Sequence, residues 1–217
     1  MYILSRSYTL LSLIFFLCLL SCEPKPVIPP RVTNNSEISN QIISREGIPL
    51  LKSGDIVLRS GTGPDSYILS RFNKRDKTYS HCGIVMIENG YPFVYHSIGG
   101  EDNPDERLRR DSASLFFSPR YNSGMAIVRY DIDGKHIRAL DSVVCSYYKS
   151  RPRFDLKFDL ATDDKLYCAE FVYKALSKAM NDTGYIKTSF ALGRRYVGVD
   201  DLFLNPHCRI LWKVAFK

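Results

Sequence analysis

The sequence predicts an α+β fold, in which an antiparallel sheet packs against helices that lie elsewhere in the chain. Two short apolar segments flank the dipeptide Asn89-Gly90, a pattern that favours a β-hairpin. Residues 165–180 carry apolar side chains at helical spacing, so they predict an amphipathic helix. Strand-like and helix-like segments occur in separate stretches, which favours α+β over a regular alternation of strands and helices.

The individual elements follow from local pattern. Apolar or β-branched segments predict strands over residues 55–58, 82–87, 93–98, 125–130 and 210–216. Helical spacing predicts a turn near 67–72 and helices over 135–149 and 165–180, the last with cap candidates at 162–164. Residues 99–123 are expected to form a long polar connection, which serves either as a lid or specificity loop or as a plain surface segment.

The first 21 residues are predicted to be an export signal. Arg6 precedes an apolar run from Leu10 to Leu20. A run of about a dozen residues is too short for a membrane span, which needs roughly 20. The run ends in Leu19-Leu20-Ser21-Cys22, which resembles the lipobox of bacterial lipoproteins and implies a lipid on Cys22. The alternative is an ordinary secretory signal with a chance cysteine at the cleavage site.

The remainder divides into a tether over 22–43 and a folded domain over 44–217. The tether contains four prolines between residues 24 and 30, then Asn34-Asn35-Ser36, so it is expected to be extended at first and flexible afterwards. With a lipidated Cys22, this arrangement predicts an exported protein anchored to a bacterial membrane, on its periplasmic or cell-surface face.

Composition supports a folded domain and argues against nucleic-acid binding. The chain has 217 residues, of which 45% are hydrophobic and 24% charged, as in globular proteins. Its formal charge is +7, and residues 22–217 keep +6 because the first 21 contain one arginine and no acid. The basic residues are scattered, so no nucleic-acid partner is predicted. The oligomeric state is not indicated.

Six cysteines are present. Cys18 lies in the signal and Cys22 takes the lipid; the other four are Cys82, Cys145, Cys168 and Cys208. Four cysteines in an exported domain allow two disulfides. If Cys168 stays free, the remaining three allow at most one. No CxxC pair occurs, so a zinc ribbon is not expected and no cofactor is predicted.

Cys168 lies in the first turn of the predicted helix, where the helix terminus lowers a thiol pKa and favours the nucleophilic thiolate. The alternative is a buried structural cysteine. His81 and His96 lie on the two arms of the predicted hairpin, so antiparallel pairing brings them to the same end. They either form a pair beside the thiol or point to opposite sheet faces. His136 and His207 are expected at the surface.

These segments resemble a known enzyme family. Residues 53–57 and 80–85 (SGDIV and SHCGIV) resemble the core of NlpC-type papain-like cysteine hydrolases. Residues 154–156 and 166–172 (FDL and LYCAEFV) resemble the nucleophile helix of the YiiX/YebB-like branch. The resemblance covers about residues 50–180. It implies a circularly permuted papain-like fold, in which an antiparallel sheet packs against a nucleophile helix that follows the histidine hairpin.

The resemblance also implies roles for three residues. Cys168 matches the nucleophile and His81 the general base. His96 matches the third, polar position that orients the base. That position is more often acidic in this branch and is histidine in ordinary NlpC-type enzymes.

Further candidates lie beside these residues. Glu170 matches the branch motif, and structural, substrate-facing and plainly solvated roles are all open. The backbone N–H of Cys168 is a natural oxyanion donor. Tyr79 and Tyr67 are candidates for the second donor.

The sequence thus favours a membrane-anchored cysteine hydrolase that cleaves an amide or ester bond through a thioester intermediate. The resemblance implies envelope substrates such as a wall peptide or an N-acyl amino acid. A thiol acyltransferase acting on lipids and a non-catalytic lipoprotein that binds acyl or peptide ligands remain as alternatives. A zinc site formed by His81, His96 and Cys168 is a third possibility.

Overall fold

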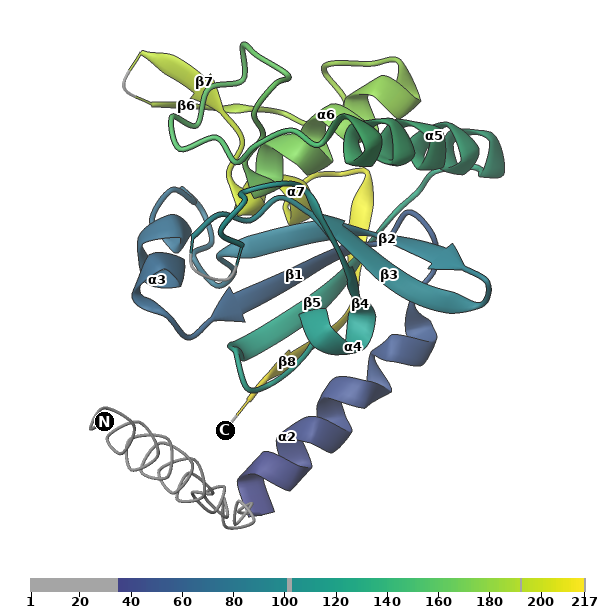
Figure 1. Cartoon of the computed structure of the whole chain (residues 1–217), viewed down its shortest axis with the longest axis vertical. Helices are drawn as coiled ribbons and strands as arrows, with labels where there is room; N and C mark the ends of the chain where they lie inside the picture. The colour runs from purple at the N-terminus through teal and green to yellow at the C-terminus, as the bar shows by residue number, and fades with distance from the viewer. Residues whose placement is uncertain (1–34, 101–102, 192, 217) are drawn as a thin grey trace, which may run out of the picture. The chain divides into compact units, whose positions relative to one another are not determined.

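A six-stranded antiparallel sheet forms the centre of the computed structural model, which describes residues 35–100, 103–191 and 193–216 (Figure 1). Its strand order is β4-β3-β2-β1-β5-β8. The strands are β1 (Ile56–Gly61), β2 (His81–Glu88), β3 (Tyr91–His96), β4 (Arg109–Ser112), β5 (Asn122–Tyr130) and β8 (Cys208–Ala215). A separate two-stranded sheet pairs β6 (Ser189–Ala191) with β7 (Arg194–Tyr196). This arrangement confirms the α+β prediction.

Helices of different lengths accompany this sheet. They are α2 (Asn35–Glu46), the 3-10 helix η1 (Ile48–Leu50), α3 (Pro64–Ser70), α4 (Ala113–Phe116), α5 (Gly134–Ser150), α6 (Cys168–Met180) and α7 (Val199–Phe203). Figure 1 shows α5 and α6 side by side over one face, and α6 packs on β2. The sheet therefore has a face covered by α6 and an opposite face.

Alternation along β2 assigns its side chains to these two faces. Cys82 and Ile84 belong to the apolar core that includes α6. Val85 belongs to the core on the opposite face, with Phe116 of α4. His81 has the same parity as Val85, so the first two residues of β2 point to different faces of the sheet.

Two predicted elements differ from the structure. Helix α6 begins at Cys168 rather than residue 165, because the Glu170 side chain accepts a hydrogen bond from the backbone N–H of Tyr167 and caps the helix there. The polar segment 99–123 contains β4 and α4. The Ser112 hydroxyl accepts from the backbone N–H of Leu115 and starts α4.

The prediction of a flexible tether is wrong for its last part, because α2 occupies residues 35–46. Glu37 in its first turn and Arg45 in its last complement the helix dipole. Residues 35–216, as far as the structure describes them, belong to one compact unit that includes α2. The signal segment, Cys22 and the prolines lie outside the described residues. In the described part of the chain, no helix has the length and hydrophobicity of a membrane span.

Candidate active site

The two hairpin histidines form a buried pair. His81 begins β2, His96 ends β3, and the register Ile84↔Tyr95 turns both side chains to the face opposite α6. The distance between His81 Nε2 and His96 Nδ1 is 2.9 Å, and the ring planes lie at 80°. The prediction that they meet at one hairpin end is confirmed, and the alternative of opposite faces is wrong.

An aspartate that the sequence did not single out extends this pair. Asp111 lies on β4, and its Oδ2 is 3.1 Å from His96 Nε2. Arg109, on the same strand, holds the Asp111 carboxylate with an Nη2–Oδ2 distance of 2.8 Å. The result is a linear chain from His81 through His96 to Asp111 across three adjacent strands.

The hydrogen bonds that link His81, His96 and Asp111 determine which nitrogen of each imidazole carries the proton. Asp111 is a carboxylate and only accepts, so His96 Nε2 carries the proton that it donates. His96 Nδ1 is then an acceptor, and His81 Nε2 donates to it. His81 Nδ1 is left with its lone pair and without the proton. That atom is the one suited to take a proton from a thiol.

The electrostatics keep both imidazoles neutral and the carboxylate ionised. Burial, with the Arg59 guanidinium next, lowers the pKa of His81 well below its ordinary value. Burial also lowers the pKa of His96, although the hydrogen bond to Asp111 opposes this. Burial opposes ionisation of Asp111, but its hydrogen bonds to His96 and Arg109 hold its pKa below the ordinary value. These directions agree with the tautomers assigned above.

Gly83 makes room for the pair. A Cβ at this position would lie 2.6 Å from Val94 Cγ1 and 3.0 Å from His96 Cβ. A larger residue would push β3 and its histidine away, so the glycine is required for close packing of this hairpin.

The candidate nucleophile lies on the other face of β2. Cys168 is the first residue of α6, after the N-cap Tyr167, and it is buried. A hydrogen bond from the Cys82 thiol lowers the pKa of Cys168; burial opposes this, and the backbone N–H of Ala169 adds to it. The reading of Cys82 as a core residue is confirmed, and its position against the nucleophile is a further finding. Cys82, Cys145, Cys168 and Cys208 are all free thiols.

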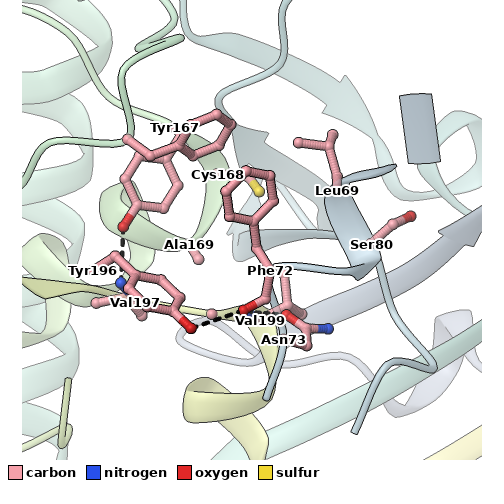
Figure 2. Close-up of a pocket in the computed structure, with 12 residues that line it drawn as sticks. Leu69, Phe72, Asn73, Ser80, Tyr167, Cys168, Ala169, Tyr196, Val197 and Val199 are labelled. Atoms are coloured by element: carbon pink, nitrogen blue, oxygen red, sulfur yellow. Dashed lines mark hydrogen bonds between the residues drawn. The ribbon is translucent and has the colours of Figure 1, made fainter. Parts of the chain in front are cut away.

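A small apolar pocket surrounds Cys168 (Figure 2). Its cavity volume is about 20 Å³, room for one water. Its other lining residues are Leu69, Phe72, Asn73, Ser80, Phe158, Tyr167, Ala169, Tyr196, Val197, Gly198 and Val199. The Tyr167 hydroxyl accepts from the Val197 backbone N–H at 2.8 Å and fixes the wall behind the thiol.

Cys168 and His81 lie near the same end of β2, one on each face of the sheet. Among the described residues no hydrogen bond joins them, and Cys82 is the side-chain partner of the thiol. Ser80 and Leu69 line both the pocket at Cys168 and a second cavity, of about 450 Å³, that His81 lines. The two cavities therefore adjoin at these residues. In unliganded enzymes, catalytic hydrogen bonds are often long and tighten only with substrate.

Glu170 has a structural position. It is fully buried, so the solvated reading is wrong. Its Oε2 accepts from the Tyr167 backbone N–H at 3.1 Å, and its Oε1 pairs with Lys174 Nζ at 2.9 Å. Burial raises the pKa of Glu170 to about 7, even though Lys174 opposes the shift.

The other candidates do not line the pocket at Cys168. Tyr79 is buried and packs edge-on against Phe203, with ring centroids 5.4 Å apart. Tyr67 is exposed on α3. His136 bonds to Asp133 at the start of α5, and His207 stacks on Tyr185 near the surface. We assign Tyr79 a packing role.

The residues described do not suit a metal ion. His81 Nε2 and both nitrogens of His96 are engaged in the hydrogen-bonded chain, and Cys168 faces Cys82. Within residues 35–216, apart from 101, 102 and 192, no group of three histidine, cysteine, aspartate or glutamate side chains is arranged to hold a metal. The structure does not gather His81, His96 and Cys168 as ligands.

Comparison with known proteins extends these observations at the level of the fold. No family model and no curated protein matches the sequence. Among solved structures, the chain is similar to the crystal structure of the metalloprotein yiiX from Escherichia coli O157:H7, with a TM-score of 0.59 and 17% identity. The match covers 76% of this chain and 97% of that one. The candidate site is thus built on a YiiX-like α+β fold.

Proposed function

We propose that this protein is a thiol hydrolase in which Cys168 is the nucleophile and His81 the general base. One observation carries the proposal: the chain His81–His96–Asp111 leaves a lone pair on His81 Nδ1, at the same end of β2 as a thiol of lowered pKa. A nucleophile, a base and a group that orients the base are the three parts that covalent acyl transfer requires.

The reaction divides into two steps. In the first, the Cys168 sulfur attacks the carbonyl carbon of an amide, the thiol proton passes to His81 Nδ1, and the leaving amine takes that proton as the C–N bond breaks. The product is a thioester on Cys168. In the second, water gives a proton to His81 and attacks the thioester, and the C–S bond breaks to release a carboxylic acid. The thiol recovers its proton from His81.

Helix α6 supplies the electrostatic support for both steps. Cys168 is its first residue, so its backbone N–H has no acceptor in a preceding turn of the helix; this N–H lies beside the Cys168 thiol, where the oxyanion would form. The positive end of the helix favours the thiolate as well.

We also propose the finer topology and the setting. The chain order of His81, His96 and then Cys168 supports a circularly permuted papain-like arrangement of the NlpC type. The lipobox-like segment that ends at Cys22 supports export and a lipid anchor. Together they favour an envelope substrate, either a wall peptide or an N-acyl amino acid.

The experiment compares the wild type with Cys168→Ala and Cys145→Ala on wall peptides and N-acyl amino acids. Cys145 is a second free thiol and serves as a matched control. We expect Cys168→Ala to abolish release of the carboxylic acid, and Cys145→Ala to retain it. Intact-protein mass spectrometry should detect the acyl group on Cys168 in the wild type.

Equal hydrolysis by Cys168→Ala and the wild type would refute the proposal. Tight ligand binding without turnover by either protein would favour a binding lipoprotein instead.

A further inference from the structure

Two cavities flank the histidine chain on the face opposite α6. One, of about 450 Å³, is lined by His81, Arg59 and Ser80 among others. The other, of about 230 Å³, is lined by His96, Arg59 and Asp111 among others. Arg59 is a charged residue that lines both, so its side chain lies at the boundary between them. The first cavity has the volume of a small-molecule site.

Strand pairing holds Arg59 beside the base. On β1, Arg59 is directly opposite His81 on β2, so the two side chains project from the same face. The Arg59 guanidinium carbon lies 5.1 Å from the centroid of the Phe116 ring. That ring also contacts both imidazoles, with centroids 5.8 Å from His81 and 5.3 Å from His96. The aromatic ring thus fixes the cation next to the histidine pair.

The positive charge of Arg59 acts on both imidazoles and contributes to lowering the pKa of each. An anion bound at Arg59 would therefore sit within electrostatic range of the base.

We propose that Arg59 binds a carboxylate of the substrate close to the scissile amide. This inference rests on the proposed hydrolase function and narrows it to amides that carry a carboxylate, as N-acyl amino acids and peptides with a free C-terminus do. A guanidinium offers two parallel N–H donors that match a carboxylate, and such charge-assisted bonds are strong. Neutral amides and neutral lipid esters lack this anchor.

The test uses two probes that differ in one group: N-lauroyl-alanine and its primary carboxamide, N-lauroyl-alaninamide. Hydrolysis of the lauroyl amide is measured for wild type, Arg59→Gln, Arg59→Lys and the control Arg120→Gln. Arg120 is an exposed arginine whose guanidinium carbon lies 5.5 Å from the centroid of Tyr121, a residue that lines both cavities. Arg120→Gln therefore removes a guanidinium that lies near the two cavities but lines neither of them.

We expect the wild type to show a lower KM for the carboxylate. In Arg59→Gln, that KM should rise about 10- to 100-fold while the carboxamide KM stays unchanged. Arg59→Lys should recover part of the preference, and Arg120→Gln should behave as wild type. An equal loss for both probes would indicate a merely structural role, and an unchanged preference would overturn the proposal.

A binding measurement separates this inference from the hydrolase function. Calorimetry with Cys168→Ala, alone and combined with Arg59→Gln, gives the Kd of both probes without turnover. A carboxylate preference that disappears with Arg59 supports the inference even if the wild type hydrolyses neither probe. Turnover by the wild type with equal binding of both probes contradicts it while leaving the hydrolase function intact. Failure of both probes to bind also contradicts it.

Discussion

The Asp111 carboxylate determines which nitrogen of His81 is free. In Asp111→Asn, Arg109 would hold the amide oxygen and the amide N–H₂ would face His96, which must then accept at Nε2. His96 would donate from Nδ1 to His81 Nε2, and the His81 proton would move to Nδ1. The base would lose its lone pair, so we expect hydrolysis to fall by about 100-fold or more.

The matched control for this change is Asp141→Asn, which removes an exposed carboxylate from the surface of α5. It should retain the wild-type rate of cleavage of the N-lauroyl-alanine probe. Wild-type activity in Asp111→Asn would show that the aspartate does not control the base.

Cys82 is a second residue whose effect is measurable. Its thiol donates to Cys168 and is the main cause of the lowered pKa there. We expect Cys82→Ala to raise that pKa and slow alkylation of Cys168 by iodoacetamide at pH 7 several-fold. Cys82→Ser keeps an O–H donor and should stay close to the wild type. Peptide mass spectrometry gives the rate at each cysteine, with Cys145 as internal reference.

If Cys82→Ala and Cys82→Ser reacted at one rate, the hydrogen bond would not explain the reactivity of the thiol. The backbone N–H groups at the start of α6 would then be its main support.

The first turn of helix α6 is capped by the Glu170 side chain, whose pKa is raised by burial. The pKa of Glu170 is raised from 4.5 to about 7, so the folded state binds the proton more tightly than the unfolded state. The free energy of unfolding therefore falls as pH rises between these values, by roughly 3 kcal/mol from this group. Glu170→Gln keeps an acceptor for the Tyr167 N–H and removes the titration.

Denaturant unfolding at pH 5 and pH 8 tests this dependence. We expect the wild type to lose more stability than Glu170→Gln over that interval, since every other titrating group is common to both. A parallel loss in the two proteins would show that Glu170 ionises with its ordinary pKa.

Some helices and strands of this fold can be predicted from the sequence, and others cannot. The hairpin over β2 and β3 and the apolar stripe of α6 have strong local patterns, which predict both elements close to their observed positions. Strand β4 is not predicted, because its residues, Arg-Arg-Asp-Ser, lack apolar alternation and form a strand only by pairing with β3. Helix α2 is not predicted, because Asn34-Asn35-Ser36 resembles a linker.

The residues of the candidate site also divide into those that a local motif predicts and those that only strand pairing places. His81, His96 and Cys168 stand in recognisable motifs, so the sequence predicts them directly. Asp111 and Arg59 contribute through cross-strand neighbours, and a pairing register is needed before either meets a histidine. Sequence spacing alone gives no such register for β4, which lies within a long polar segment.

The lipobox-like segment predicts that the protein is anchored to a membrane through a lipid on Cys22. We expect wild-type protein to incorporate labelled palmitate and to sediment with membranes, and Cys22→Ala to do neither. Cys18→Ala is the matched control, since it changes a cysteine inside the apolar run and leaves the lipobox-like segment intact. Cleavage of N-lauroyl-alanine by purified Cys22→Ala should equal that of the wild type.

Label on Cys22→Ala, or its retention in the membrane fraction, would contradict lipidation at this residue. Loss of label in Cys18→Ala as well would point to failed export rather than to a missing anchor.

Two consecutive residues of strand β2 take part in the proposed chemistry. His81 points toward His96, and Cys82 points toward the nucleophile Cys168. Slipping this strand by one residue against its neighbours would exchange the two sides and present an imidazole to α6 and a thiol to His96. An insertion or deletion within β2 should therefore abolish activity more completely than one in the connection before β4. Evolutionary changes in length are expected to concentrate in that connection and to spare the strand.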